Sequence, residues 1–173
     1  MYRKDDWIFN QYVEGLSKAK PLPTDIKTNK QMLQVAIKKL HSNAVIPSYA
    51  KPGDAGLDLT ATSIISNTTT EVTYGTGLAL EIPTDYVGLI FPRSSIRKYD
   101  LQLSNSVGVI DSGHRGEIQF TFNKTQGHNS VKYKVGDRIG QLLILPYPQI
   151  QLIEEASLSN TERGEGSFGS SGQ

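Results

Sequence analysis

Short runs in which apolar and polar residues alternate recur along most of this chain. Alternation puts every second side chain on one face, which is the pattern of a half-buried β-strand. Turn-forming residues stand between the runs, for example Pro52-Gly53-Asp54 and Asp111-Ser112-Gly113. No helical pattern intervenes, so we expect an all-β sandwich or barrel of the jelly-roll type. The alternating runs occupy 33–37, 78–82, 87–91, 118–122 and 131–135.

Composition restricts the classes of function. The 173 residues carry 18 Lys and Arg against 17 Asp and Glu, and a net charge of +1 argues against a general binder of nucleic acid or membrane surfaces. The chain has no cysteine, which excludes disulfides and thiolate-held zinc. Its aliphatic run 142–145 is far shorter than the roughly 20 residues of a spanning helix, and no secretory signal is apparent. We therefore expect a cytoplasmic protein.

Three segments are expected along the chain. Residues 1–30 predict a short helix, with Trp7, Tyr12 and Leu16 on one face, followed by a Pro-containing linker. That extension either packs on the body or binds a protein partner whose identity the sequence does not give. Residues 31–156 are expected to form the β core, and residues 157–173 a flexible arm rich in Gly and Ser.

The arm has the residue types that a nucleotide lid needs. Gly and Ser offer backbone N–H and hydroxyl donors to phosphate oxygens, Arg163 can pair with a phosphate, and Phe168 offers a face for a base. A flexible tail without function is the alternative for such a composition.

Four further polar segments interrupt the strand pattern. Asp58 lies between leucines; Arg93, Ser94 and Ser95 follow a strand that Pro92 ends; Gln141 precedes an apolar run. Asp111 follows two β-branched residues, so we expect it to be partly shielded and able to deprotonate a water. Each also has an ordinary structural interpretation, such as a capping serine or a turn aspartate.

Together and in this order, the five segments over residues 55–172 resemble those of the trimeric dUTP pyrophosphatase (dUTPase) family. The resemblance implies a β jelly roll and a homotrimer with shared active sites. In such an assembly the C-terminal arm closes over a neighbouring subunit's site. It implies hydrolysis of dUTP to dUMP and pyrophosphate. It also implies Mg²⁺ carried by the triphosphate through water, with no direct protein ligand and Asp58 as a possible outer-shell contact.

The resemblance also assigns roles to residues. Asp111 corresponds to the aspartate that activates the attacking water, and Gln141 to a glutamine at the phosphates. Ser94 corresponds to the serine that supports the leaving oxygen, and Arg163 to the arginine on the terminal phosphate. The expected substrate-binding residues are Arg93, Ser95, Asn105, Gly108, Val109, Ile110, His114, Phe168, Gly169, Ser170 and Ser171.

One departure from the family pattern concerns the sugar. His114 stands where the family usually has a tyrosine that packs on deoxyribose, and imidazole is smaller and titrates near neutral pH. We therefore expect weaker, or pH-dependent, rejection of UTP.

Two alternative functions stay open at this point. A dCTP deaminase would need a glutamate where this chain has Thr121. A dUTPase-like regulatory protein would use nucleotide-gated closure of the arm to control a partner.

Overall fold

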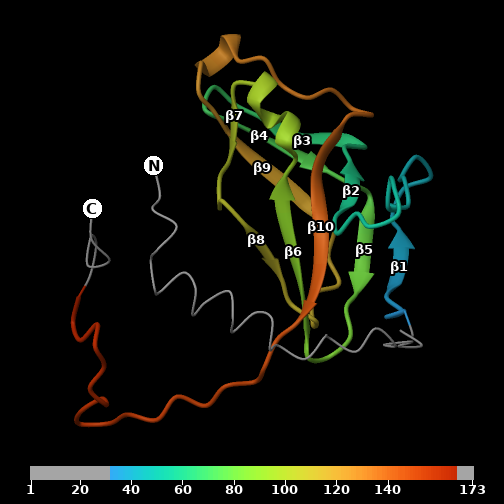
Figure 1. Cartoon of the computed structure of the whole chain (residues 1–173). Helices are drawn as coiled ribbons and strands as arrows, with labels where there is room; N and C mark the ends of the chain where they lie inside the picture. The colour runs from blue at the N-terminus through green and yellow to red at the C-terminus, as the bar shows by residue number, and fades with distance from the viewer. Residues whose placement is uncertain (1–31, 167–173) are drawn as a thin grey trace, which may run out of the picture. The chain divides into compact units, whose positions relative to one another are not determined.

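The computed structural model describes residues 32–166. Its regular elements are almost all strands, and they confirm the expected all-β fold (Figure 1). The strands are β1 (Ala36–Lys39), β2 (Leu57–Thr60), β3 (Ser63–Asn67), β4 (Glu71–Gly75), β5 (Leu78–Glu81), β6 (Tyr86–Pro92), β7 (Leu101–Leu103), β8 (Gly108–Ile110), β9 (Gln119–Lys124) and β10 (Arg138–Pro146). Two short 3₁₀ turns, η1 (Ser94–Lys98) and η2 (Gly127–Asn129), complete the set.

The strands form antiparallel sheets with long-range pairing. One four-stranded sheet has the order β2-β10-β6-β8, and the other has the order β3-β4-β9-β7. A third, two-stranded sheet pairs β1 with β5. Strands that pair in a sheet are rarely consecutive along the chain, which is the connectivity expected of a jelly roll. Within the first sheet, β10 is central and pairs with both β2 and β6.

Aromatic and branched side chains fill the interior between the sheets. Phe120 and Phe122 alternate along β9 with polar neighbours, and both are fully buried, as the run 118–122 predicts. Val72 and Tyr74 on β4 and Ile139 on β10 meet them in the same cluster. Burial of such side chains contributes about 1.5–3 kcal/mol each relative to exposure, so this cluster is a main source of stability.

The predicted strand at 131–135 is wrong. The segment has no strand pairing, and of its three apolar residues only Tyr133 is buried. Side chains occupy its backbone donors instead: Val131 N donates to Asp100 Oδ2, and Lys134 N donates to Asp137 Oδ2. Aspartates that bond nearby backbone compete with strand pairing in this way.

The run 87–91 is a strand, but its inward face differs from the expected one. Gly88 and Ile90 are buried on β6, whereas Val87, Leu89 and Phe91 are half-buried. A Cβ on Gly88 would lie 2.7 Å from Ile82 Cδ1, so the strand packs closely there and a larger residue would require Ile82 to move.

Contacts divide the chain into residues 1–34 and 35–173. The predicted N-terminal helix and its linker lie outside the described residues, and the boundaries at 30 and 156 stay predictions. No helix among residues 32–166 is long and apolar enough to cross a membrane.

Candidate active site

The turn after β6 carries the first group of predicted site residues. Pro92 ends the strand, and Arg93 is the residue before η1, with extended backbone angles. Ile96 N donates to Arg93 O at 2.9 Å, which closes the first turn. Ser94 is exposed and Ser95 half-buried, and neither the Arg93 side chain nor any other described side chain caps this turn. The turn thus presents serine hydroxyls beside a guanidinium.

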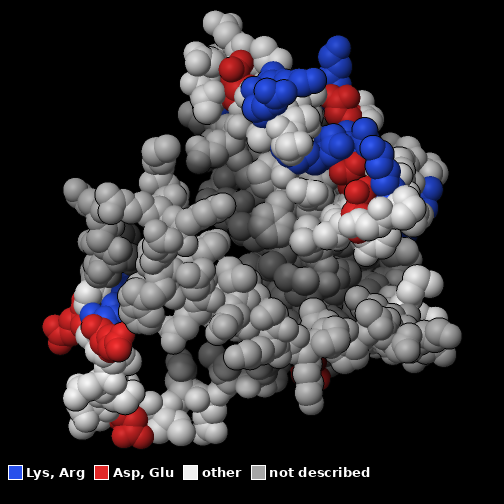
Figure 2. Space-filling model, viewed as in Figure 1, with Lys and Arg blue, Asp and Glu red and all other residues white. Residues whose placement is uncertain are grey.

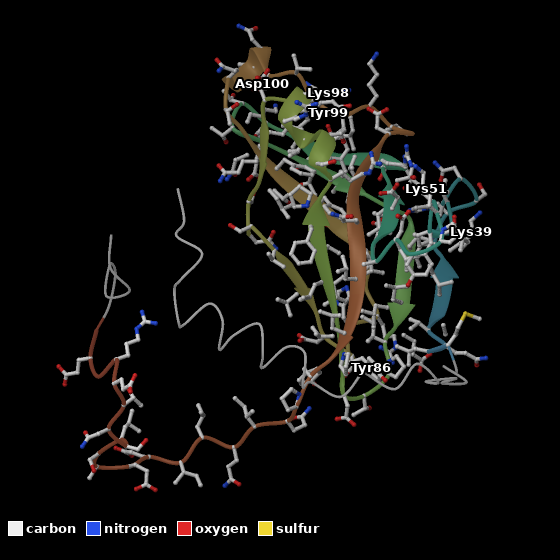
Figure 3. All side chains as sticks on the ribbon, viewed as in Figure 1. Lys39, Lys51, Tyr86, Lys98, Tyr99 and Asp100 are labelled. Carbon is white, nitrogen blue, oxygen red and sulfur yellow. The ribbon has the colours of Figure 1, made fainter. Side chains whose placement is uncertain are left out.

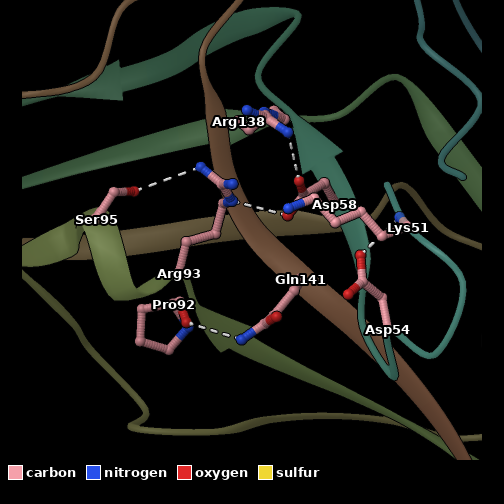
Figure 4. Close-up of polar contacts among 8 residues, drawn as sticks. All are labelled: Lys51, Asp54, Asp58, Pro92, Arg93, Ser95, Arg138 and Gln141. Atoms are coloured by element: carbon pink, nitrogen blue, oxygen red, sulfur yellow. Dashed lines mark hydrogen bonds and ion pairs between the residues drawn. The ribbon is translucent and has the colours of Figure 1, made fainter. Parts of the chain in front are cut away.

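An aspartate on β2 holds this turn through an ion pair. Arg93 Nε donates to Asp58 Oδ1 at 2.7 Å, and Arg138 Nη1, at the start of β10, donates to Asp58 Oδ2 at 2.8 Å (Figure 4). The Asp58 side chain is only 19% exposed. One carboxylate therefore orients two cations, one from the turn after β6 and one from the start of β10, and keeps both near the surface.

Gln141 lies beside this ion pair on β10, an inner strand of the sheet. On β10 it stands opposite Asp58 of β2 and Phe91 of β6, and its Nε2 makes a long, 3.4 Å contact with Pro92 O. A Cβ on Gly56 would lie 2.6 Å from Gln141 Oε1, so this glycine leaves the room that the amide occupies. Sequence order alone could not reveal that Gly56 has this role.

A pocket opens next to these residues. It has a volume of about 290 Å³ and is lined by Arg93, Ser95, Lys98, Tyr99, Gly136, Asp137 and Arg138. Lys and Arg side chains gather at this end of the described body, with acidic groups among them (Figure 2). Three of the lining residues are cationic and one is anionic, so the pocket suits an anionic group.

The second group of predicted residues lies on and around β8, an edge strand that pairs with β6. Asn105 and His114 are exposed, Gly108 and Ile110 are buried, and Val109 is 64% exposed. Gly108 lies close against Ile90, since a Cβ there would be 2.3 Å from Ile90 Cγ1.

Asp111 follows β8 directly and is exposed, so the expected shielding is wrong for the single chain. Because Ile110 turns inward, the next residue faces away from the core. His114 N donates to Asp111 O at 3.0 Å, and Arg115 Nη1 donates to the carbonyls of Ser112 and His114 at 2.6 and 2.9 Å. These bonds order the turn that carries Asp111.

The strand register separates the two groups within one chain. Gln141 stands opposite Phe91, whereas Ile110, which precedes Asp111, stands opposite Gly88. The separation of Asp111 from Gln141 has two parts. Along β6, three residues correspond to about 10 Å. Across the sheet, β8 and β10 flank β6 on opposite sides, which adds two strand spacings of about 5 Å each. The structure therefore brings Asp58, Arg93, Ser95 and Gln141 together, and places Asp111 elsewhere.

The arm contributes one described residue. Arg163 is exposed, and its Nε donates to Gly166 O at 3.1 Å within its own turn, so it is not joined to the other predicted residues. Phe168, Gly169, Ser170 and Ser171 lie outside the described residues.

Arg138 and Lys98 were missed as candidates by the sequence reasoning. Arg138 pairs with Asp58 across 80 residues of chain, and only the three-dimensional pairing of β2 with β10 reveals it. A cation at the start of a strand, three positions before Gln141, was the available signal.

Comparison with known proteins decides the family. The dUTPase family model matches residues 42–172. The deoxyuridine 5′-triphosphate nucleotidohydrolase of Gloeobacter violaceus is 42% identical over 146 residues, covering 81% of this chain and 97% of that protein. The chain belongs to the dUTPase family. The enzyme of the same name from Clostridium kluyveri is 35% identical over 142 residues and covers 81% of this chain and 99% of its own.

Solved structures of family members share the fold. A dUTPase of Staphylococcus bacteriophage 80alpha with dUpNHpp superposes with a TM-score of 0.73 at 26% identity, covering 82% of this chain and all of that chain. Its G164S mutant, also with dUpNHpp, gives a TM-score of 0.72 at 26% identity over the same shares.

Thr121, which occupies the place of the deaminase glutamate, has a structural bond instead. Its hydroxyl lies 2.9 Å from that of Thr73 on the neighbouring strand. Nothing in the family match or in this contact supports deamination.

Proposed function

We propose that this protein hydrolyses dUTP to dUMP and pyrophosphate. The observation that carries the proposal is the Asp58–Arg93–Gln141 arrangement at one end of the sheet, in a chain that the dUTPase model matches over residues 42–172. It gives a charged, partly buried setting for a triphosphate. The name of the relatives, deoxyuridine 5′-triphosphate nucleotidohydrolase, states the same reaction for them.

In the proposed reaction, Asp111 accepts a proton from a water molecule, whose oxygen attacks the α-phosphorus. The bond from the α-phosphorus to the bridging oxygen breaks, and pyrophosphate leaves with the electron pair. Asp111 is exposed at a turn, so it is accessible to a substrate that a second subunit presents. Gln141 would help to place the water and the phosphates, since its amide lies at the centre of the cluster.

Neutralisation of charge is the other part of the mechanism. Arg93, already oriented by Asp58, and Arg163 of the arm would pair with phosphate oxygens, and Ser94 would donate to the leaving oxygen. The uracil and sugar would lie against the segment around β8, with Asn105, Gly108, Val109, Ile110 and His114. The arm residues Phe168, Gly169, Ser170 and Ser171, with Ser95, would complete the substrate contacts. Most of the rate enhancement would come from positioning and electrostatics.

Mg²⁺ is the cofactor that we propose. No group of three or more His, Cys, Asp or Glu side chains that could hold a metal is found within residues 32–166. We propose that the triphosphate would carry the ion. When bound, such an ion would neutralise phosphate charge. Asp58 would face the water shell of the ion while still paired with Arg93 and Arg138.

The separation of Asp111 from Gln141 supports a homotrimer with shared active sites. Residues that must meet at one substrate lie on different parts of one chain, so a second copy would supply the missing half. The segment after β10 also leaves aliphatic side chains uncovered: Ile150, Leu152, Ile153 and Leu158 are 73–89% exposed. We propose that a neighbouring subunit covers them as the arm crosses to its site.

Product analysis tests the function. The protein is mixed with Mg²⁺ and, separately, with dUTP, dCTP, dTTP and UTP, and Asp111→Asn is treated in the same way. Pyrophosphate and dUMP from dUTP alone, abolished by the substitution, would support substrate and base together. Ammonia released from dCTP would point to deamination, and no turnover by a folded oligomer would refute the hydrolase.

A regulatory role is a second candidate, because phage dUTPases such as the Staphylococcus bacteriophage 80alpha protein control transfer of virulence genes by a G protein-like mechanism. In this chain, residues 1–30 would contact the partner and nucleotide-dependent closure of the arm would gate it. A pull-down with and without residues 1–30, in the presence and absence of dUpNHpp, tests this. A partner that depends on both would support the role, and none in any condition would argue for a plain enzyme.

A further inference from the structure

One buried tyrosine next to the candidate site is not used by the proposed reaction. Tyr133 is 2% exposed, although it lies in an irregular segment before β10. Its ring packs at 3.9 Å between centroids against Tyr99, the residue that ends η1. Lys98 and Tyr99 lie at the end of this turn (Figure 3), and both line the pocket beside Arg93.

The hydroxyl of Tyr133 has an unusual environment. It is buried, and no hydrogen-bond partner with proper alignment is found for it among residues 32–166. Burial raises the pKa of Tyr133, whereas the nearby Ser95 hydroxyl and Arg93 guanidinium act in the opposite direction. The hydroxyl therefore lies near the Ser95 side chain. A buried hydroxyl without an aligned partner disfavours the folded state, so some compensating role is expected.

The backbone around Tyr133 is fixed to the same turn. Asp100 N donates to Val131 O at 2.9 Å, and Val131 N donates to Asp100 Oδ2 at 2.7 Å, directly after η1. On the core side, buried Tyr74 donates its Oη hydrogen to the Tyr133 carbonyl at 2.7 Å. Tyr133 is thus held between the core and the turn.

We propose that Tyr133 is a positioning residue whose ring and hydroxyl support η1 and so fix Arg93, Ser94 and Ser95 for the triphosphate. This rests on the proposed function, because the turn matters only if phosphates bind to it. Tyr133 acts through the turn and does not touch the substrate. The sheet register and the Asp58 ion pair orient Arg93 from one side, and Tyr133 supports the serines from the other.

Tyr133→Phe separates this role from a purely structural one. Removing an unpaired buried hydroxyl should leave the melting temperature unchanged or higher. The KM for dUTP should nevertheless rise about three- to tenfold with a smaller change in kcat, because ground-state positioning is lost. Tyr99→Leu, which removes the ring on the other side, should raise KM in the same direction.

Tyr74→Phe is the matched control. It also removes a buried phenol hydroxyl, but one that bonds the Tyr133 carbonyl and does not face the turn. We expect a lower melting temperature with an unchanged KM, the reverse of the Tyr133→Phe result.

Limited trypsin digestion gives a readout that does not need turnover. Arg97 and Lys98 lie in η1, and cleavage after them reports how often the turn opens. Tyr133→Phe should speed that cleavage, and Tyr74→Phe should do so less. Unchanged cleavage, or faster cleavage with an unchanged KM, would overturn the proposal. A wild-type protein that leaves dUTP intact would instead refute the hydrolase, while the cleavage rates would still show whether Tyr133 holds the turn.

Discussion

Asp58 Oδ1 accepts a hydrogen bond from Arg93 Nε at 2.7 Å across 35 residues of chain, while the other Asp58 oxygen accepts one from Arg138. The carboxylate therefore sets the direction of a guanidinium that we place at the phosphates. Any role toward Mg²⁺ would come in addition to this structural one.

Asp58→Asn should lower kcat/KM by about 10- to 100-fold, because misplacing one charged contact has effects of that size. Arg138 is 53% exposed, so the loss of stability should stay at about 1 kcal/mol. Titration with Mg²⁺ is the decisive measurement, and the rate should stay low at every concentration. Recovery at high Mg²⁺ would show that the carboxylate acts mainly through the metal's water. Asp54→Asn is the control, because that exposed carboxylate caps only Lys51 N in its own turn (Figure 4).

Two variants with low residual activity should complement each other. If the sites are shared between subunits as proposed, Asp111→Asn and Gln141→Ala damage different halves, and mixed oligomers contain some sites with both halves intact. Random mixing in equal amounts should restore about a quarter of wild-type activity per site. The assay compares the two variants refolded together with the two refolded separately and then mixed on ice. If joint refolding restores nothing, Asp111 and Gln141 serve the same subunit's site.

Gly56→Ala should reduce activity with little loss of stability. The added Cβ would lie 2.6 Å from Gln141 Oε1, and the flexible end of that side chain would move aside. We expect kcat to fall about tenfold while the free energy of unfolding changes by less than about 1 kcal/mol. In a Gln141→Ala background the same change should have no further effect on the rate. An equal loss in both backgrounds would mean that Gly56 matters for another reason.

His114→Tyr should sharpen the preference for dUTP over UTP. The His114 ring lies over Gly116, where a Cβ would be 2.9 Å from Cε1, so the backbone there accepts a flat ring. A larger ring should exclude a 2′-hydroxyl better and raise the ratio of the two kcat/KM values about tenfold. The ratio is measured between about pH 6 and 8. Gly113→Ala, which meets nothing within 4 Å, is the control and should leave the ratio unchanged.

Alkaline pH should weaken the folded state through the buried tyrosines. Burial, with Asp137 as a further cause, raises the pKa of Tyr74 to about 12 from an ordinary value near 10. Between these values the unfolded chain releases the proton and the folded chain keeps it, so stability falls as pH rises. Urea unfolding of wild type and Tyr74→Phe should differ most at pH 8 and converge toward pH 12. A constant difference would show that Tyr74 ionises equally easily in both states.

The sequence predicts the fold best where local pattern and packing agree. Phe120 and Phe122 alternate along β9 and are both buried. The pattern fails at 131–135, because Asp100 and Asp137 bond the backbone there and no strand pairs with it. On β6 the inward face was misassigned because buried Gly88 has no side chain to mark it.

The sequence likewise predicts some residues of the candidate site and not others. Asp58, Arg93 and Gln141 stand out as polar residues in or next to apolar strands, and the structure brings them together. Arg138, Gly56 and Tyr133 could not be found in this way, because their roles come from contacts between segments that are far apart in the sequence. That Asp111 stands apart could be recognised only after the register of β6 with its two neighbours was known.

The distance between Asp111 and Gln141 also has a consequence for how hydrolysis would begin in a cell. A newly synthesised monomer would be inactive, and turnover would appear only above the concentration at which subunits associate. One inactive subunit in a mixed oligomer would inactivate the sites that it shares with normal subunits. The loss of activity would therefore exceed the fraction of inactive subunits.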